Sequence, residues 1–158
     1  MTDRAFIAPD RSGPRRIVTG LDVEGRSCIL IDGPVPRTAT GNQLIWRAAS
    51  LPADNGGTAD TSVPFSIEHL KDGSGGFSIV DLPVGLGRFM HAADTLDYLI
   101  ILKGTISLEM EVGEVTLGPG DCVVQRGTMH AWRNDGPETV TMASITLPAL
   151  PVGNGATI

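Results

Sequence analysis

Residues 96–120 read LDYLIILKGTISLEMEVGEVTLGPG, and this stretch decides the fold class. From Thr105 to Val112 polar and apolar side chains alternate strictly, with Ile106, Leu108, Met110 and Val112 on one side. A repeat of two residues is typical of a β-strand with one buried face and one face in water. Glycines at 104, 113, 118 and 120 interrupt the stretch after a few residues each time. The pattern predicts short strands joined by tight turns.

The same rhythm continues on both sides of this stretch. Short runs rich in β-branched or aromatic residues, separated by glycine and proline, predict further strands at 17–19, 28–31, 44–46 and 77–82. Residues 88–103 also come close to a helical stripe, but the Ile100–Ile101 pair and the flanking glycines favour an extended strand. The expected fold class is all-β, with two antiparallel sheets in a sandwich or barrel and little or no helix.

The predicted strand at 96–103 is apolar on both faces. Leu99 and Ile101 share one face with Asp97, while Tyr98, Ile100 and Leu102 form the other. A strand that is apolar on both faces needs cover on both. We expect the first face to line the interior and the second to pack on the N-terminal strands or on a second subunit, which makes a homodimer the expected assembly.

Size and charge exclude several classes of protein. The chain has 158 residues and fits one domain, and its formal net charge of −6 would repel phosphate backbones, so nucleic acid is not an expected partner. No apolar stretch is long enough to cross a bilayer, and residues 1–16 do not resemble a signal peptide. We therefore expect a cytoplasmic protein that binds no membrane. Cys28 and Cys122 fall in predicted strands without metal-type spacing, so we expect buried free thiols.

Three regions are expected along the chain. Residues 1–15 form an N-terminal tail, residues 16–147 the β-barrel domain, and residues 148–158 a C-terminal tail. Residues 51–62 (LPADNGGTADTS) form a polar loop too long for a hairpin turn, and such loops often cover binding sites.

Two segments carry the residues expected to do chemistry. The first, GLGRFMHAADTLDYLIILKG from Gly85 to Gly104, resembles the first cupin motif, G-x5-H-x-H-x3,4-E-x6-G, with His91 as the first histidine. Ala93 stands at its second histidine position and Asp97 at its glutamate position. The second, GDCVVQRGTMHAWRN from Gly120 to Asn134, resembles the second motif, G-x5-P-x-G-x2-H-x3-N. Gly127, His130 and Asn134 match, Gln125 replaces the proline, and one residue is missing before it.

The resemblance implies a small single-domain cupin, a jelly-roll barrel that binds a divalent metal inside through histidines and a carboxylate. Since Ala93 cannot bind a metal, the remaining donors are His91, Asp97 and His130. Two imidazoles and one carboxylate are a set used by non-haem iron, and manganese, nickel or zinc also accept it. An aspartate reaches about 1.5 Å less far than a glutamate. Asp97 is therefore expected as a direct ligand, or as an acceptor that orients an imidazole, or as a general base.

Catalysis is expected to involve Asp97 and His130, with Trp132, Tyr98 and Gln125 shaping a pocket for a small polar organic substrate. Trp132 lies two residues after His130 and should face the same side of its strand. The expected function is that of a metal-dependent enzyme. Its reaction class is left open among dioxygenase, decarboxylase, isomerase and dehydratase. The alternative, prompted by Ala93, is a non-catalytic barrel that binds or senses a small ligand.

Overall fold

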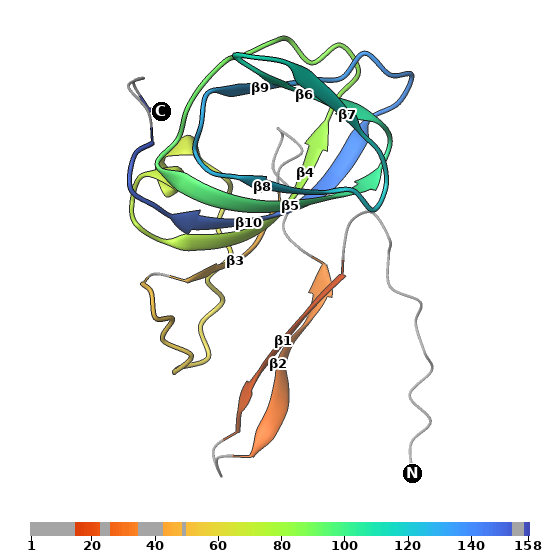
Figure 1. Ribbon diagram of the computed structural model, residues 1–158. Coiled ribbons are helices and arrows are strands. Elements are labelled where there is room, and N and C mark those ends of the chain that lie inside the picture. The colour runs from red at the N-terminus through yellow and green to blue at the C-terminus, as the bar shows by residue number, and fades with distance from the viewer. Residues whose placement is uncertain (1–14, 23–25, 35–42, 49, 153–156) are drawn as a thin grey trace.

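The computed structural model describes residues 15–22, 26–34, 43–48, 50–152 and 157–158. Its described residues form ten strands and a single turn of 3-10 helix (Figure 1), and none of its helices is long and apolar enough to cross a membrane. In chain order the elements are β1 (Arg15–Leu21), β2 (Ser27–Pro34), β3 (Gln43–Ala48), η1 (Ile67–Leu70), β4 (Gly75–Leu82), β5 (Thr95–Lys103), β6 (Ile106–Met110), β7 (Glu114–Leu117), β8 (Cys122–Gln125), β9 (His130–Arg133) and β10 (Val140–Pro148).

Two antiparallel sheets face each other and enclose the core. The larger sheet has the strand order β3-β4-β10-β5-β8, and the smaller has the order β7-β6-β9. Figure 1 looks into the barrel that they form, with the smaller sheet at the top of the view. The expected all-β jelly-roll is confirmed. The core between the sheets consists of Leu99, Ile101, Ile106, Leu108, Leu117, Val140 and Met142.

Strand β5 is apolar on both faces, as predicted for residues 96–103. Leu99 and Ile101 are buried in the core, and Tyr98, Ile100 and Leu102 are exposed on the opposite face. β5 is a central strand that pairs with β10 on one side and β8 on the other, so the helical alternative for this segment is wrong. The alternation in 105–112 ends earlier than expected, because the strand stops at Met110 and Val112 lies in the following turn.

The first two strands form a hairpin outside the barrel. β1 and β2 pair antiparallel in a two-stranded sheet of their own. Figure 1 shows this hairpin extending away from the barrel, beyond β3. The strands predicted at 17–19 and 28–31 are thus present, but the two barrel sheets begin at β3.

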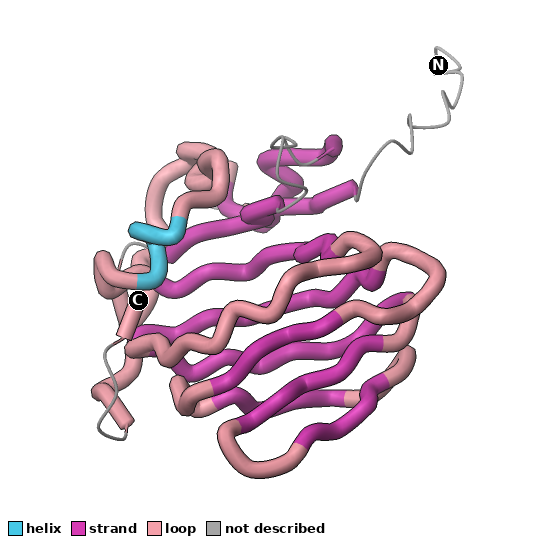
Figure 2. The backbone as a smooth tube through the Cα atoms, turned by 90° about the horizontal axis from the view of Figure 1, so that it is seen from above, coloured by secondary structure: helices cyan, strands magenta, loops and turns pink. Residues whose placement is uncertain are grey.

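The segment between β3 and β4 contains the η1 turn, drawn in cyan in Figure 2. Residues 51–60, which make up most of the predicted covering loop, are exposed. The part that reaches the inner side of β3 and β4 comes later in the segment, at Phe65 and His69. The two cysteines are free as expected, but the prediction that they are buried is wrong, since Cys28 is partly buried and Cys122 is exposed.

Candidate functional site

The two motif segments lie side by side through their backbones. The N–H of His91 donates to the carbonyl of His130, and the N–H of His130 donates to the carbonyl of His91, both at 2.9 Å. Two residues further along, the N–H of Ala93 donates to the carbonyl of Gly127 at 3.3 Å. Since residues directly opposite in an antiparallel pair point to the same face, this pairing brings the two histidines together.

The motif residues without reactive groups hold this arrangement in place. Gly127 has a φ of +70°, and a Cβ built on it would lie 2.3 Å from the carbonyl oxygen of Ala93, so only glycine fits there. Asn134 is fully buried and donates from Nδ2 to the carbonyls of Leu82 and Glu138, each at 2.9 Å. The backbone carbonyl of Asn134 accepts from the N–H of Gly85 at 3.0 Å, which joins the end of the second motif to the start of the first.

The two imidazoles are neighbours with matching hydrogen bonds. Their ring centroids are 4.4 Å apart, and the ring planes are tilted by 48°. Nδ1 of His91 lies 3.0 Å from the carbonyl of Phe89, and Nδ1 of His130 lies 2.8 Å from the carbonyl of Thr128. A carbonyl oxygen only accepts, so Nδ1 is the protonated nitrogen in both rings. In the neutral rings both Nε2 atoms therefore keep a lone pair for a metal, a proton or a substrate.

The surroundings of His130 favour its neutral form. Burial lowers the pKa of His130, the hydrogen bond to Thr128 opposes this change, and the neighbouring His91 lowers the pKa further. Phe89 stacks on His91 with a centroid distance of 5.1 Å, and Trp132 meets the ring of His130 edge-on at 6.3 Å. A neutral imidazole is the form that binds metals and accepts protons.

Asp97 lies on the inner face of β5. It shares a cross-strand row with Thr146 of β10 and Gln125 of β8. Burial raises the pKa of the Asp97 carboxyl, although hydrogen bonds from Thr146 and Thr95 and the charge of His91 act to lower it. Thr95 donates to Oδ2 at 3.0 Å, whereas Oδ1 is buried without a hydrogen-bond partner. A buried carboxylate oxygen left in this state is typical of a functional group.

The three expected pocket residues occupy three different kinds of position in the structure. Trp132 faces inward, as predicted, and packs between His130 and the core. Gln125 is buried directly opposite Asp97, but its amide is already bonded to Thr128 through both its oxygen and its nitrogen. Tyr98 points to the outer face of β5, opposite Asp97, and is 43% exposed. The prediction that it lines the same pocket is therefore corrected, because alternation along the strand turns it away.

The side chains present fit a metal through the imidazole pair alone. His91 and His130 offer two neighbouring Nε2 atoms, which suit zinc, iron, nickel or manganese. Among the residues that the structure describes, however, no three His, Cys, Asp or Glu side chains form a group able to hold a metal together. Asp97 as a third ligand thus stays a prediction. Ala93, two residues after His91, is buried and supplies no donor.

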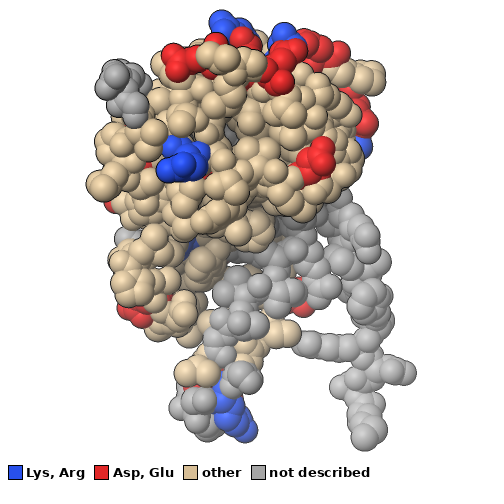
Figure 3. Space-filling model, viewed as in Figure 1, with Lys and Arg blue, Asp and Glu red and all other residues tan. Residues whose placement is uncertain are grey.

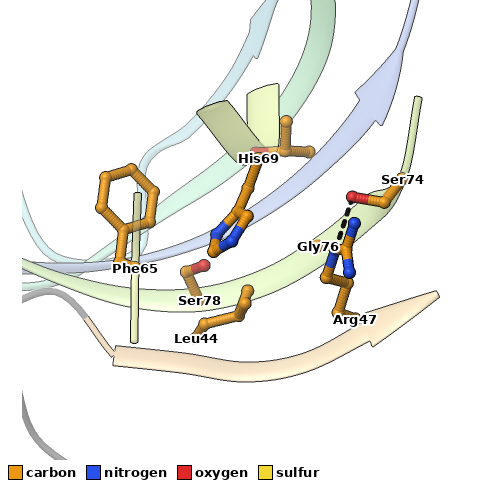
Figure 4. Close-up of a pocket in the computed structure, with 8 residues that line it drawn as sticks. Leu44, Arg47, Phe65, His69, Ser74, Gly76 and Ser78 are labelled. Atoms are coloured by element: carbon orange, nitrogen blue, oxygen red, sulfur yellow. Dashed lines mark hydrogen bonds between the residues drawn. The ribbon is translucent and has the colours of Figure 1, made fainter. Parts of the chain in front are cut away.

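A small cavity lies next to this group. It measures about 20 Å³, room for about one water molecule. Figure 4 shows His69 and Phe65 over the inner side of β3 and β4, with Arg47 bonded to Ser74 at 2.9 Å. Arg47 also forms an ion pair with Asp72. Thr146 lines the cavity and stands opposite Asp97, so the cavity adjoins the candidate site.

Sequence reasoning missed the two threonines that contact Asp97. Thr95 could have been found from the sequence, because a residue two positions away from Asp97 on a strand shares the same face. Thr146 could not, because its position opposite Asp97 depends on the register of β10 against β5.

The fold and this site define a cupin-type β-barrel with a histidine pair inside it. A family model described as the cupin domain matches residues 78–146. A cupin-domain-containing oxidoreductase of Neurospora crassa, srdD, is 32% identical over 82% of this chain and 71% of its own length. The chain belongs to the cupin family.

The chain is also similar to a second relative and to a solved structure. A cupin-domain-containing oxidoreductase of Aspergillus ruber, fogC, is 33% identical over 75% of this chain, and the match spans 63% of that relative's length. A solved structure described as a sugar phosphate isomerase from a cupin superfamily, from Silicibacter pomeroyi, is 20% identical over 48% of this chain and 51% of its own, with a TM-score of 0.42.

Proposed function

We propose that this protein is an enzyme of the oxidoreductase type that acts on a small polar organic molecule at the His91–His130 pair. The observation that carries the proposal is the pair itself, two inward imidazoles 4.4 Å apart with both Nδ1 atoms engaged and both Nε2 atoms available. The curated relatives fogC and srdD are described as oxidoreductases, which supports this reaction class.

His91 and His130 would hold the metal, and water or substrate would complete its ligand set. A bound metal of this kind supplies Lewis acidity and, for iron, one-electron chemistry. The protein's own groups then have distinct tasks. Trp132 and Phe89 limit the access of water to the rings, and the carbonyls of Phe89 and Thr128 hold them in one tautomer. Asp97, with its raised pKa and unbonded Oδ1, would accept or deliver a proton at that oxygen.

A second function, binding or sensing a small molecule without turnover, is favoured by two observations. The described residues contain no three-donor metal group, and Ala93 occupies the position where the family motif has a second histidine. A barrel of this kind would bind its ligand through Asp97 and the two imidazoles.

Metal analysis tests the first proposal. Purified protein is loaded with Fe(II), Mn(II), Ni(II) or Zn(II), desalted, and assayed for bound metal and for its melting temperature. We expect binding in the wild type that is lost in His91→Ala and His130→Ala and kept in His69→Ala. Chelator should lower the melting temperature of the loaded wild type, since a ligand at 100 times its Kd adds about 2.7 kcal/mol. Equal metal content in the wild type and both site variants would contradict it.

Turnover separates the two functions. Wild type and His130→Ala are incubated, with metal and in air, with a mixture of small polar metabolites that is followed by mass spectrometry. A compound that only the wild type converts supports the enzyme. A compound that raises the melting temperature of the wild type and is recovered intact supports the binding protein.

We further propose a cytoplasmic location, because the free Cys28 and Cys122 suit a reducing compartment.

A further inference from the structure

The cavity next to η1 is lined by hydrogen-bond donors that the protein leaves without acceptors. Arg47 is the first of them. Its Nε donates to Oγ of Ser74 at 2.9 Å, and its Nη2 forms an ion pair with Asp72. These two contacts hold the guanidinium in one orientation, while Nη1 has no partner within the part of the chain that the structure describes. Nη1 therefore keeps two N–H donors for a bound acceptor.

His69 is the second donor, because its tautomer is the reverse of that of the His91–His130 pair. The N–H of Ser66 donates to Nδ1 of His69 at 3.2 Å, within the capping box of η1. A neutral imidazole that accepts at Nδ1 carries its proton on Nε2. Figure 4 shows the ring pointing from η1 toward Ser78 of β4. Nε2 of His69 thus brings an N–H, and not a lone pair, to the cavity that this residue lines.

Ser78 and Gly76 complete the lining on β4. Ser78 is only 8% exposed, and its hydroxyl has no hydrogen-bond partner among the described residues. Gly76 has no side chain, and a Cβ built on it would stand 3.4 Å from Cδ1 of Leu44, which is also a lining residue. The missing side chain leaves space for a bound group. The described lining contains a guanidinium, an imidazole and hydroxyl groups, and no acidic side chain.

The net negative charge of the chain does not oppose an anion at this place. In Figure 3 charged side chains gather at the top of the view, over the smaller sheet. Glu109 and Glu114 lie on that sheet and form ion pairs with Arg88 and Arg133. The cavity lies on the other sheet, at β3 and β4.

We propose that this cavity binds a carboxylate group of the substrate, and that the substrate is therefore a small organic acid. The inference rests on the proposed function, since it names the class of molecule on which that enzyme acts. N–H groups of Arg47 and His69 converge there from two elements, and a charged acceptor forms the strongest hydrogen bonds with such donors. The volume of about 20 Å³ holds one carboxylate oxygen in place of a water molecule, and is too small for a phosphate group.

The sheet register connects this carboxylate subsite to the candidate reaction site. Arg47, Gly76, Thr146 and Asp97 occupy one cross-strand row on β3, β4, β10 and β5. Neighbouring strands are about 4.8 Å apart, so Gly76 and Asp97 are separated by about 10 Å. Thr146 lines the cavity and also hydrogen-bonds the Asp97 carboxyl. A small acid that is anchored over Gly76 therefore extends along this row toward Asp97, and a fixed anchor orients its other end for reaction.

Binding of simple acids to the metal-free protein tests the subsite without any need for turnover. Acetate, succinate and glutarate are titrated by calorimetry, each beside its uncharged amide, together with inorganic phosphate. Asp72 balances part of the charge of Arg47, so we expect affinities in the millimolar range. Each acid should bind at least about tenfold more tightly than its amide, because hydrogen bonds to a charged group are the stronger ones. Phosphate should not bind. In nuclear magnetic resonance spectra acetate should shift the backbone amides of Gly76 and Ser78.

Three variants separate carboxylate binding from a merely structural role of the Arg47–Asp72 ion pair. Arg47→Gln removes the charge, and Gly76→Ala fills the space while leaving that ion pair intact. His69→Glu keeps an acceptor for the capping box but places a negative charge in the cavity. We expect at least about tenfold weaker succinate binding in all three. Lys103→Gln, which removes an exposed positive charge paired with Glu138, is the matched control and should bind succinate like the wild type. Circular dichroism checks that each variant is folded.

Three results would overturn the inference. They are acids that bind no better than their amides, subsite variants that bind succinate like the wild type, and a wild type that binds no acid at millimolar concentration. Metal loading of the same samples distinguishes this failure from that of the proposed function. A wild type that loads metal and binds no acid refutes the carboxylate subsite alone. A wild type that binds acids through Arg47 and loads no metal keeps the subsite and contradicts the metal-dependent enzyme.

Discussion

At the scale of single residues, Asp97 combines burial, a raised pKa and an unbonded oxygen. Such a group stabilises the folded state only while it is protonated. Stability from Asp97 is present below the ordinary aspartate pKa of 3.8, which applies in the unfolded chain, and is lost as the pH rises through the higher folded pKa. At neutral pH the buried charge is therefore a cost to folding that a functional role would explain.

Replacing Asp97 by Asn should make the metal-free protein more stable at neutral pH. The amide keeps the shape and removes the buried charge, so we expect a gain of about 1 kcal/mol in the free energy of unfolding near pH 7 and little difference near pH 4. Urea unfolding with chelator present measures the free energy of unfolding of the variant and the wild type at each pH. A variant that is less stable than the wild type at pH 7 would show that the carboxylate is stabilised by partners and is not poised for chemistry.

Ala93 is the second informative residue, because it is buried beside the histidine pair and offers no donor. We expect Ala93→His to bind Zn(II) or Ni(II) at least about tenfold more tightly than the wild type, since a third imidazole adds to the first two. The added bulk should destabilise the metal-free protein by about 1–3 kcal/mol. Ala93→Leu is the control for bulk alone. If both variants respond to metal equally in thermal unfolding, position 93 does not face the metal.

At the scale of elements, the site depends on how two segments pair. His91 and His130 meet because the backbone ladder around them is in register and because Gly127 lets the chain pass Ala93 closely. The register of β5 against β10 and β8 then places Thr146 and Gln125 in the same row as Asp97. None of these contacts is local in sequence.

Gly127→Ala should disturb both stability and the histidine pair. Its Cβ would meet the carbonyl of Ala93 at 2.3 Å, and the φ of +70° is unfavourable for alanine. We expect a loss of about 2–4 kcal/mol in the free energy of unfolding together with weaker metal binding. Gly113→Ala, also at positive φ but with nothing near its Cβ, isolates the backbone cost and should lose only about 1 kcal/mol. Equal losses in the two variants, by denaturant unfolding, would refute the close-approach explanation.

At the scale of the whole molecule, stability comes from the core between the two sheets. Ile101 is 1% exposed there. We expect Ile101→Ala to lower the free energy of unfolding by about 2–5 kcal/mol, because it removes buried methyl groups and leaves a cavity. Val112→Ala, in an exposed turn, should change it by no more than about 0.5 kcal/mol. Guanidinium unfolding of both measures the difference, and a loss below about 1 kcal/mol for Ile101 would mean that the sheets do not pack tightly there.

The sequence by itself determined the pattern of strands and the choice of His91 and His130 as the candidate site. The two-residue alternation at 105–112 and the apolar faces of 96–103 depend only on neighbours in the chain, and they predicted β6 and β5. The two cupin-like motifs predicted that His91 and His130 belong together, and their rings are indeed adjacent. The burial of the cysteines and the pocket role of Tyr98 were not predicted correctly.

The tertiary structure alone decided which side chains share a surface. Thr146 and Asp97 are 49 positions apart in the sequence, and their contact exists only through the register of β10 against β5. The separation of the hairpin from the barrel likewise depends on which sheet β1 and β2 pair with, not on their composition. The physical reason is that alternation along a strand sets which way a side chain faces, whereas pairing between distant strands sets what it meets.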